Sequence, residues 1–316
     1  AKIKVVLTTS PAGDAPDYMV VDLSTAKVDR VTYYPGAAWL PGGISNGDYL
    51  SNKIVMRHIR AKGESYRMGS LGEAGRSSNE YAHTVTLTND FWIGVFEATY
   101  AQMFRFGLST ASALPVRNSP YNHIRGSTST CDWPIKPAAS SYIGRLRADT
   151  GLPFDLPSEA QWEFACRAGT TSALYTGKEL EADCDTSSPN LQEIARFKQT
   201  QAETAYTSTP TTGNGDQDTT KGTATVGSYR ENGYGLYDMI GNVLEWCLDY
   251  WCPDISEINP ETGASVATDT NLKRVKRGGC YAHSPQRLRS AYRIDGNYNT
   301  TRASDGFRVC APVGIP

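Results

Sequence analysis

The stretch RVKRGGCYAHSPQRLRSAYRIDGNYNTTRASDGFRVC, from Arg274 to Cys310, mixes motif-like strings with unrelated side chains. The Gly278-Gly279 pair, RSAYR and GFR are the regular parts. Between them stand Cys, Tyr, His, Pro, Leu, Ile, Asp and Asn without helical or strand periodicity. The pattern suggests a fixed frame around variable positions, and three interpretations are open for those positions: a catalytic centre, a recognition surface or a plain loop.

Charge is distributed unevenly along the chain. Residues 271–316 carry nine Lys or Arg and two acids, a net +7, which leaves −9 for the rest of a chain whose total is −2. The near-neutral total gives no reason to expect a nucleic-acid partner. The basic segment has two explanations: a face for an anionic ligand, or arginines that pack on aromatic rings and pair with the acidic remainder.

Length and composition limit the class of protein. A chain of 316 residues can form one large domain or two ordinary ones. Its 29 Gly and 18 Tyr favour irregular strands and loops over long helices. No apolar run approaches the roughly 18 residues of a membrane span, and no signal peptide is recognised.

Seven cysteines leave the redox compartment open. They include no C-x-x-C pair, so a zinc site is not indicated. One or two disulfides and a spare thiol would suit an exported protein, whereas seven free thiols would suit a cytosolic one. Localisation stays open, with export or cell-surface display favoured.

Secondary-structure signals are short and local. Residues 1–60 read as a small β-rich unit in which β-branched runs alternate with Pro, Gly and Asp turns. Helices are predicted near 99–106, over 138–151 and over 158–169. In the last of these, Ser158 and Gln161 form a capping box. Residues 170–235 are polar and turn-rich, and a bound ligand or metal would help to order them.

Two stretches offer oxygen ligands for a hard cation such as Ca²⁺. The first combines Asn190-Leu191 with the acidic loop GDQDTTKG, Gly215–Gly222. The second is GNVLEW, where Glu245 lies between Leu244 and Trp246 and should be partly buried. A buried carboxylate needs a partner, and either a cation or an arginine would serve.

Several motifs in order resemble the formylglycine-generating enzyme, or sulfatase-modifying factor, family. They are YRMGS, FWIGVFEATYAQM, LPSEAQWEFACRAGT, NGYGLYDMIGNVLEWCLDYW, RVKRGGCY, RSAYR and DGFRV, spread over about Ile54 to Ala311. The resemblance implies an α+β variant of the C-type lectin fold, with little regular secondary structure, a few helices and a small twisted antiparallel sheet. We expect this domain over residues 56–316 and a separate β-rich unit over residues 1–55.

The resemblance implies two calcium sites. The first would use the side chains of Asn190 and Asp218 and the carbonyls of Leu191 and Thr220. The second would use the carbonyls of Ile240, Gly241 and Val243 and the carboxylate of Glu245.

This chain lacks the cysteine pair of the family's oxidase centre. Its two copper-binding cysteines lie five residues apart after the Gly-Gly turn, and the corresponding positions here are His283 and Leu288. Thiolates are the soft ligands that copper(I) requires. Cys280 stands three residues too early, so we expect no copper. In some members the helix cysteine, here Cys166, forms a disulfide with one after GFR. Cys310 is the candidate, but Val309 offsets it by one residue, which in a strand means the opposite face.

A scaffold that keeps its frame without the catalyst is predicted to act in recognition. The residues that alternate with the frame are of types common in binding surfaces. They are Tyr281, Ala282, His283, Ser284, Gln286, Leu288, Tyr292, Ile294, Asp295, Asn297, Tyr298 and Asn299. We expect them to face solvent and to bind a protein or a glycan. The pattern also resembles the variable proteins of diversity-generating retroelements, although Pro285 and Leu288 fit adenine mutagenesis less readily.

Two other functions remain open. The chain could be a divergent metal-dependent oxidase that uses Cys280 and His283. It could also be an assembly component whose N-terminal unit docks to a partner.

Overall fold

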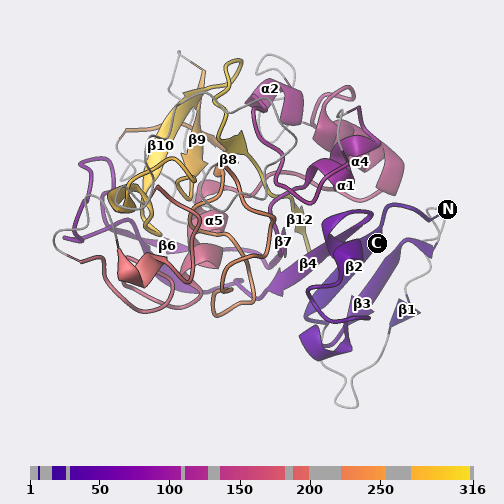
Figure 1. Cartoon of the computed structure of the whole chain (residues 1–316), viewed down its shortest axis with the longest axis horizontal. Coiled ribbons are helices and arrows are strands. Elements are labelled where there is room, and N and C mark those ends of the chain that lie inside the picture. The colour runs from indigo at the N-terminus through magenta and orange to yellow at the C-terminus, as the bar shows by residue number, and fades with distance from the viewer. Residues whose placement is uncertain are drawn as a thin grey trace.

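The computed structural model describes residues 6–7, 16–25, 29–107, 111–126, 136–181, 188–198, 222–253 and 272–313. Figure 1 shows short strands and helices joined by long irregular segments. The predicted mixture of few helices and small sheets is confirmed.

The larger sheet has six strands in the order β1-β3-β2-β4-β7-β12. β2 and β4 pair antiparallel, with Val20 opposite Val55, whereas β1 and β3 pair parallel. Their valines, isoleucines and aromatic residues favour extended backbone. The strands are β1 (Val6–Leu7), β3 (Val31–Tyr34), β2 (Tyr18–Asp22), β4 (Lys53–Ile59), β7 (Phe91–Gly94) and β12 (Cys310–Pro312).

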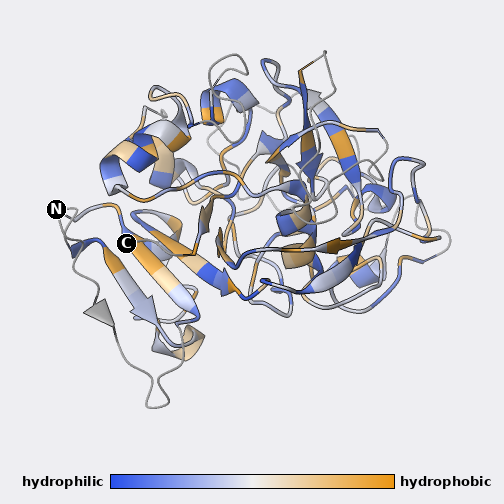
Figure 2. Cartoon of the chain, turned by 180° about the vertical axis from the view of Figure 1, so that it is seen from behind, coloured by the Kyte–Doolittle hydropathy of each residue, from blue (hydrophilic) through white to orange (hydrophobic). Residues whose placement is uncertain are grey.

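Both faces of this sheet are buried. Met19 and Ile54 pack into one hydrophobic cluster, whereas their neighbours Val20 and Val55 pack into the other. Successive side chains on a strand point to opposite faces, so an apolar residue at every position indicates a sheet covered on both sides. Figure 2 shows apolar residues along the strands nearest the N-terminus.

The second sheet carries the C-terminal frame. Its order is β10-β9-β8-β11, and β10 is an edge strand that pairs antiparallel with β9. Separately, β5 and β6 pair as a two-stranded sheet. The strands are β8 (Leu244–Tyr250), β9 (Lys273–Arg277), β10 (Arg293–Asn297), β11 (Asp305–Gly306), β5 (Ser65–Met68) and β6 (His83–Thr86).

The three helices predicted from the sequence are present, and a fourth, Tyr121–Ile124, was not predicted. Thr99 and Ser158 each form a capping box with the glutamine three residues on, and Ser141 caps the helix between them. Gly151, at φ 75°, ends that helix. The helices are α1 (Tyr100–Phe104), α2 (Tyr121–Ile124), α4 (Tyr142–Thr150) and α5 (Glu159–Arg167). In the described part of the chain, none of them has the length and apolar character needed to cross a membrane.

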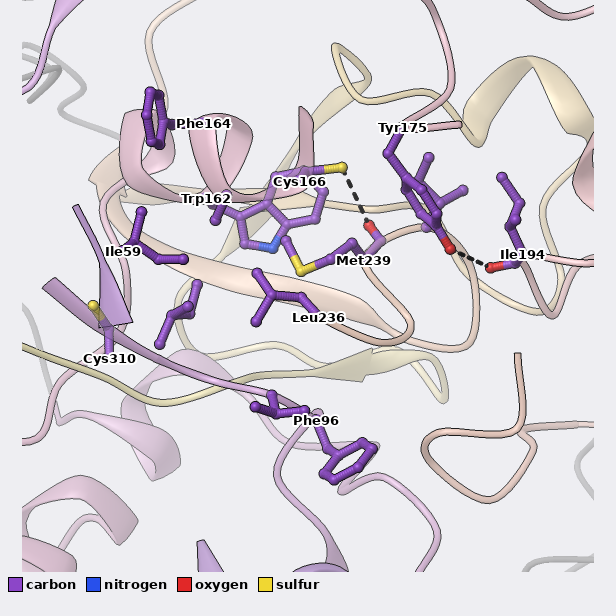
Figure 3. Close-up of a cluster of buried hydrophobic side chains, with 14 of the residues drawn as sticks. Ile59, Phe96, Trp162, Phe164, Cys166, Tyr175, Ile194, Leu236, Met239 and Cys310 are labelled. Carbon is purple, nitrogen blue, oxygen red and sulfur yellow. Dashed lines mark hydrogen bonds between the residues drawn. The ribbon is translucent and has the colours of Figure 1, made fainter. Parts of the chain in front are cut away.

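The helices contribute side chains to both hydrophobic clusters that bury the larger sheet. Trp162 of α5 belongs to the same cluster as Val20 and Val55, and Figure 3 shows it among those buried side chains. Met103 of α1 and Leu146 of α4 belong to the cluster on the other face.

The N-terminal strands are part of the larger sheet. β2 pairs with β4, and the expected boundary between residues 55 and 56 falls inside β4. The described residues before this boundary therefore extend the sheet of the main domain instead of forming a sheet of their own.

Candidate functional site

The arginines of the C-terminal frame are buried in ion pairs. Arg293 makes two hydrogen bonds of 2.7 Å to the Glu159 carboxylate. Arg277 lies 3.2 Å from the same carboxylate and also pairs with Glu163. All four side chains are 0% exposed. These pairs fasten β9 and β10 to helix α5.

Further ion pairs neutralise more of the positive charge of residues 271–316. Arg289 binds Glu80 through contacts of 2.6 and 2.7 Å, and Lys276 lies 3.0 Å from Asp305. Arginines paired with the acidic remainder were one of the two explanations for the basic segment. The structure supports that explanation, because these cations are inside the protein and are not available to an anionic ligand.

The Gly278-Gly279 turn shapes the segment that follows β9. Both residues have positive φ, 88° and 71°. A Cβ on Gly279 would lie 2.4 Å from the Arg287 carbonyl oxygen. Glycine is therefore required for the chain to fold back against itself between Cys280 and Leu288.

Four of the twelve predicted binding residues are buried. The expectation that these residues face solvent is wrong for those four. Leu288 belongs to the main hydrophobic cluster, and Tyr281 packs with Cys280 in a smaller one. The rings of His283 and Tyr292 meet edge to face at 5.9 Å. The turn directs these side chains inward, where they support the segment.

The other eight predicted residues are exposed or half-buried, and we call them the recognition face. They lie on the 3-10 turn η6 (Pro285–Arg287), on edge strand β10 and in the loops beside them (Figure 1). The eight are Ala282, Ser284, Gln286, Ile294, Asp295, Asn297, Tyr298 and Asn299.

Neighbouring elements hold the recognition face in place. The Asp295 carboxylate lies 2.8 Å from Lys273 Nζ on β9. The backbone carbonyl of Tyr298 accepts a hydrogen bond of 2.9 Å from the Asn122 N–H on α2. Arg289 donates to the carbonyls of Gly75 and Gln286, which ties η6 to the loop before β6.

The residues at the family's oxidase positions are buried and lack thiols. Leu288 is 0% exposed and His283 is 9% exposed. Burial raises the pKa of the nearby Cys280 thiol to about 11. Burial, together with Arg287 and other cations, lowers the pKa of His283 to about 3. At neutral pH this region therefore presents a thiol and a neutral imidazole.

Cys166 and Cys310 do not form the candidate disulfide. The Cys166 thiol lies 3.9 Å from the Met239 carbonyl and 3.6 Å from Ser290 Oγ. The Cys310 thiol lies 3.9 Å from Gln161 Oε1. Figure 3 shows the two sulfurs in different parts of the cluster. Both thiols are free, as are those of Cys247 and Cys280.

Two of the four residues of the first expected calcium site are described, Asn190 and Leu191, and both are hydrogen-bonded to other protein groups. The Leu191 carbonyl accepts hydrogen bonds from the N–H groups of Ile194 and Ala195. Asn190 donates through Nδ2 to the Glu179 carbonyl at 3.0 Å. The other two expected ligands, Asp218 and Thr220, lie outside the described residues.

In the second expected site, Glu245 has an arginine partner. Its carboxylate accepts hydrogen bonds of 2.6 to 2.9 Å from Arg308 and one of 2.7 Å from Trp162 Nε1. The arginine pair was the alternative to a cation at this position. Ile240, Gly241 and Val243, expected to supply carbonyls, are buried in the segment just before Glu245.

Sequence reasoning missed two buried acids beside this segment, Glu97 and Asp238. The Glu97 carboxylate accepts hydrogen bonds from Asn242 Nδ2 at 2.6 Å and the Val243 N–H at 3.0 Å. Burial, with Asp238 and Glu245 nearby, raises its pKa well above the usual value. The sequence did carry a signal for Glu97, because it is a lone acid within the apolar run FWIGVFEAT. The same kind of signal identified Glu245.

Asp238 has an incompletely paired carboxylate. Its Oδ2 accepts a hydrogen bond of 2.7 Å from the Gly227 N–H, whereas its buried Oδ1 has no partner among the residues that the structure describes. Burial raises the pKa of Asp238 to about 6. The unpaired Asp238 oxygen is freer to bind a hard cation than the Glu245 carboxylate, which already has arginine and tryptophan partners.

Comparisons with known proteins find similar sequences and structures. The formylglycine-generating enzyme of Bos taurus is 31% identical over 235 residues, which cover 70% of this chain and 58% of that protein. The chain thus spans 58% of the length of the bovine and mouse enzymes that it matches.

Two solved structures share the fold. PvdO from Pseudomonas aeruginosa has a TM-score of 0.63 at 20% identity and covers 82% of this chain and 94% of its own. Treponema denticola variable protein 1 has a TM-score of 0.57 at 19% identity and covers 82% and 95%. The model of the Sulfatase-modifying factor enzyme 1-like domain matches residues 53–312, from the start of β4 to the end of β12. The resemblance read from the motifs is therefore confirmed, and the chain belongs to the sulfatase-modifying factor, or formylglycine-generating enzyme, family.

Proposed function

We propose that this protein is a non-catalytic ligand-binding member of its family, which presents the recognition face to a protein or a glycan. One observation carries the proposal. Within residues 280–299, buried side chains that fix the backbone are interspersed with exposed or half-buried ones, most of them polar. The exposed side chains can change without loss of the ion pairs and ring contacts beneath them.

The absence of the family's cysteine pair supports a role without oxidase chemistry. His283 and Leu288 occupy the two positions, and the raised pKa of Cys280 disfavours the thiolate that copper(I) would need. The name of Treponema denticola variable protein 1, which shares the fold, suggests that the recognition face also varies between relatives. Sequences of siblings from one genome, with differences concentrated in residues 280–301, would support this extension.

A combined surface variant tests the recognition role. Ser284→Ala, Gln286→Ala, Asn297→Ala and Asn299→Ala together remove polar groups from the recognition face. We expect wild-type protein to bind members of a defined array of glycans and purified surface proteins, and the variant to lose that binding with its Tm unchanged. Equal binding by both proteins would contradict the proposal. A matched variant, Ser24→Ala with Asn89→Ala, alters exposed groups elsewhere and should bind like wild type.

The alternative function, a divergent oxidase, has a direct test. Titration with copper(I) under a competing chelator should show no stoichiometric tight site, and cysteine-containing peptides should cause no oxygen consumption. Tight binding that Cys280→Ser abolishes would favour the oxidase instead.

Calcium binding is a further proposal, resting on the family and on the unpaired oxygen of Asp238. Asp238, with carbonyls from Ile240, Gly241 and Val243, would hold the ion and brace the irregular segment. We expect calcium to raise the Tm of the chelator-treated protein, and Asp238→Asn to reduce that increase. An identical Tm with calcium and with chelator would exclude this role.

A further inference from the structure

Two arginines of the C-terminal segment remain at the surface, next to the recognition face. Arg287 is the last residue of η6 and follows Gln286, and Arg302 lies in the loop before β11. Both are exposed, and neither side chain has a hydrogen bond or an ion pair within the described part of the chain. An exposed guanidinium without a partner keeps its five N–H donors for water or for a ligand. Unlike the buried arginines of β9 and β10, these two are therefore available to an anion.

Both arginines lie close to His283. Arg287 is four residues further along the chain, across the η6 turn. The loop that carries Arg302 reaches the same place because the Ser304 side chain is hydrogen-bonded to the Cys280 thiol. The charges of both arginines contribute to the low pKa of His283, to which burial contributes most. Arg287, Arg302 and His283 thus form one group, although they come from different turns.

The imidazole of His283 has hydrogen-bonding capacity left for a ligand. Its residue is 9% exposed, and neither ring nitrogen has a hydrogen-bond partner among the described residues. Nδ1 is fully enclosed, so Nε2 is the ring nitrogen that a ligand can reach. The main chain is held separately, because the His283 carbonyl accepts a hydrogen bond of 3.1 Å from the Lys198 N–H. A neutral imidazole protonated at Nε2 would donate to an anion beside the two arginines.

The acids on the neighbouring strands have cations of their own. Asp305 lies 3.0 Å from Lys276 Nζ, and both side chains are buried. Asp295 lies 2.8 Å from Lys273 Nζ. These carboxylates therefore do not neutralise the exposed arginines, and the positive charge of Arg287 and Arg302 is left for a partner.

Aliphatic surface lies beside these cations. Ala282 and Ile294 are half-buried and pack against the small cluster that contains Cys280 and Tyr281. A peptide with alternating acidic and apolar side chains matches this combination. Its carboxylates would pair with guanidinium groups, and its apolar groups would cover the aliphatic surface.

We propose that the recognition face binds an acidic segment of a partner protein, whose carboxylates are held by Arg287, Arg302 and His283 Nε2. Each guanidinium can form paired hydrogen bonds with a carboxylate, and the imidazole supplies one more donor. The inference rests on the proposed recognition role, because it assigns the class of ligand for the same face.

Three labelled probes separate the ligand classes in fluorescence anisotropy with the whole chain. A hexapeptide of alternating Glu and Leu carries both features, alternating Gln and Leu lacks the charge, and a hyaluronan hexasaccharide presents carboxylates on sugars. We expect the Glu-Leu peptide to bind at least about tenfold more tightly than the other two. Equal binding of the Gln-Leu peptide would overturn the proposal, and tightest binding of hyaluronan would replace the acidic protein by an anionic glycan.

The same experiment distinguishes this inference from the recognition role on which it rests. If the Glu-Leu peptide does not bind while the combined surface variant still loses a ligand of the array, the acidic class is wrong and the recognition role stands. If neither the peptide nor any member of the array binds, both proposals fail.

Variants locate the binding. Arg287→Gln and Arg302→Gln should each weaken the Glu-Leu peptide by about tenfold with an unchanged Tm, because both side chains are exposed and unpaired. Arg302→Lys should retain part of the affinity, since it keeps the charge and loses the paired geometry. Arg105→Gln changes an exposed arginine at the end of α1 and should have no effect. In NMR spectra, the ring signals of His283 should shift when the peptide is added. Full affinity after Arg287→Gln and Arg302→Gln are combined would show that the peptide binds elsewhere and would overturn the proposal.

Discussion

At the scale of single residues, buried charge pairs hold the C-terminal frame. Removal of one partner leaves the other charge buried and uncompensated, which is strongly destabilising. Glu80 and Arg289 show this arrangement well, because both side chains are 0% exposed and lie far apart in the sequence. The same arginine also donates to the Gly75 carbonyl.

Arg289→Met should therefore lower the free energy of unfolding by about 3–5 kcal/mol, measured by urea denaturation. Arg230→Gln is the matched control, since Arg230 and Glu193 are exposed and 4.0 Å apart. It should cost at most about 1 kcal/mol. Equal losses in the two variants would show that burial of the pair is unimportant.

His283 should make stability depend on pH. Its folded pKa of about 3 lies below the ordinary value of 6.5, so the unfolded chain binds the proton more readily between these values. Stability is therefore lost as the pH falls below about 6.5. From pH 7 to pH 5 the loss from this group should be about 2 kcal/mol.

His283→Phe, which keeps a ring of similar size in the buried site, should remove this component. The measurement is urea unfolding of both proteins at pH 7 and pH 5. The wild type should lose about 2 kcal/mol more than the variant between the two pH values. Parallel losses would assign the acid sensitivity to other groups.

At the scale of elements, the starts of helices could be predicted from the sequence. Whether the side chains of residues 280–292 point into the core or toward solvent could not. Each capping box, at Thr99 and at Ser158, spans four consecutive residues. The starts of α1 and α5 can therefore be predicted from the local sequence alone. Residues 280–292 have no strand or helix period. The inward direction of Leu288 and His283 depends on the glycine turn and on packing partners far away in sequence.

The Gly279 turn can be tested with a matched pair of substitutions. Gly279 and Gly177 both have positive φ, 71° and 83°, but a Cβ on Gly177 would have no atom within 4 Å. Gly177→Ala should cost about 1–2 kcal/mol from backbone strain alone. Gly279→Ala adds a clash with the Arg287 carbonyl and should cost about 1–3 kcal/mol more. Thermal melts of both variants would show this order, and the reverse order would contradict it.

At the scale of the whole molecule, the family could be recognised from ordered motifs, but the arrangement of the sheets could not. The order β1-β3-β2-β4-β7-β12 joins strands from both ends of the chain. Such pairings depend on contacts between distant residues, which local periodicity does not reveal. The expected boundary at residue 55 followed a change in motif content, whereas the hydrogen bonds continue across it.

The shared hydrophobic cluster predicts that the N-terminal strands and the C-terminal frame unfold together, although they belong to different sheets. Val20 and Val55 lie in one hydrophobic cluster with Val275 of β9, so loss of β2 would expose the core that supports the frame. Hydrogen exchange at the amides of β2, β4 and β9 should then give similar opening free energies, close to the global value. If residues 1–55 form an independent domain, the β2 amides should instead exchange through a separate, less costly opening while β9 stays protected. A destabilising core variant, Val20→Ala, sharpens the comparison, because it should lower protection in β2 and β9 by equal amounts only if the two sheets open as one unit.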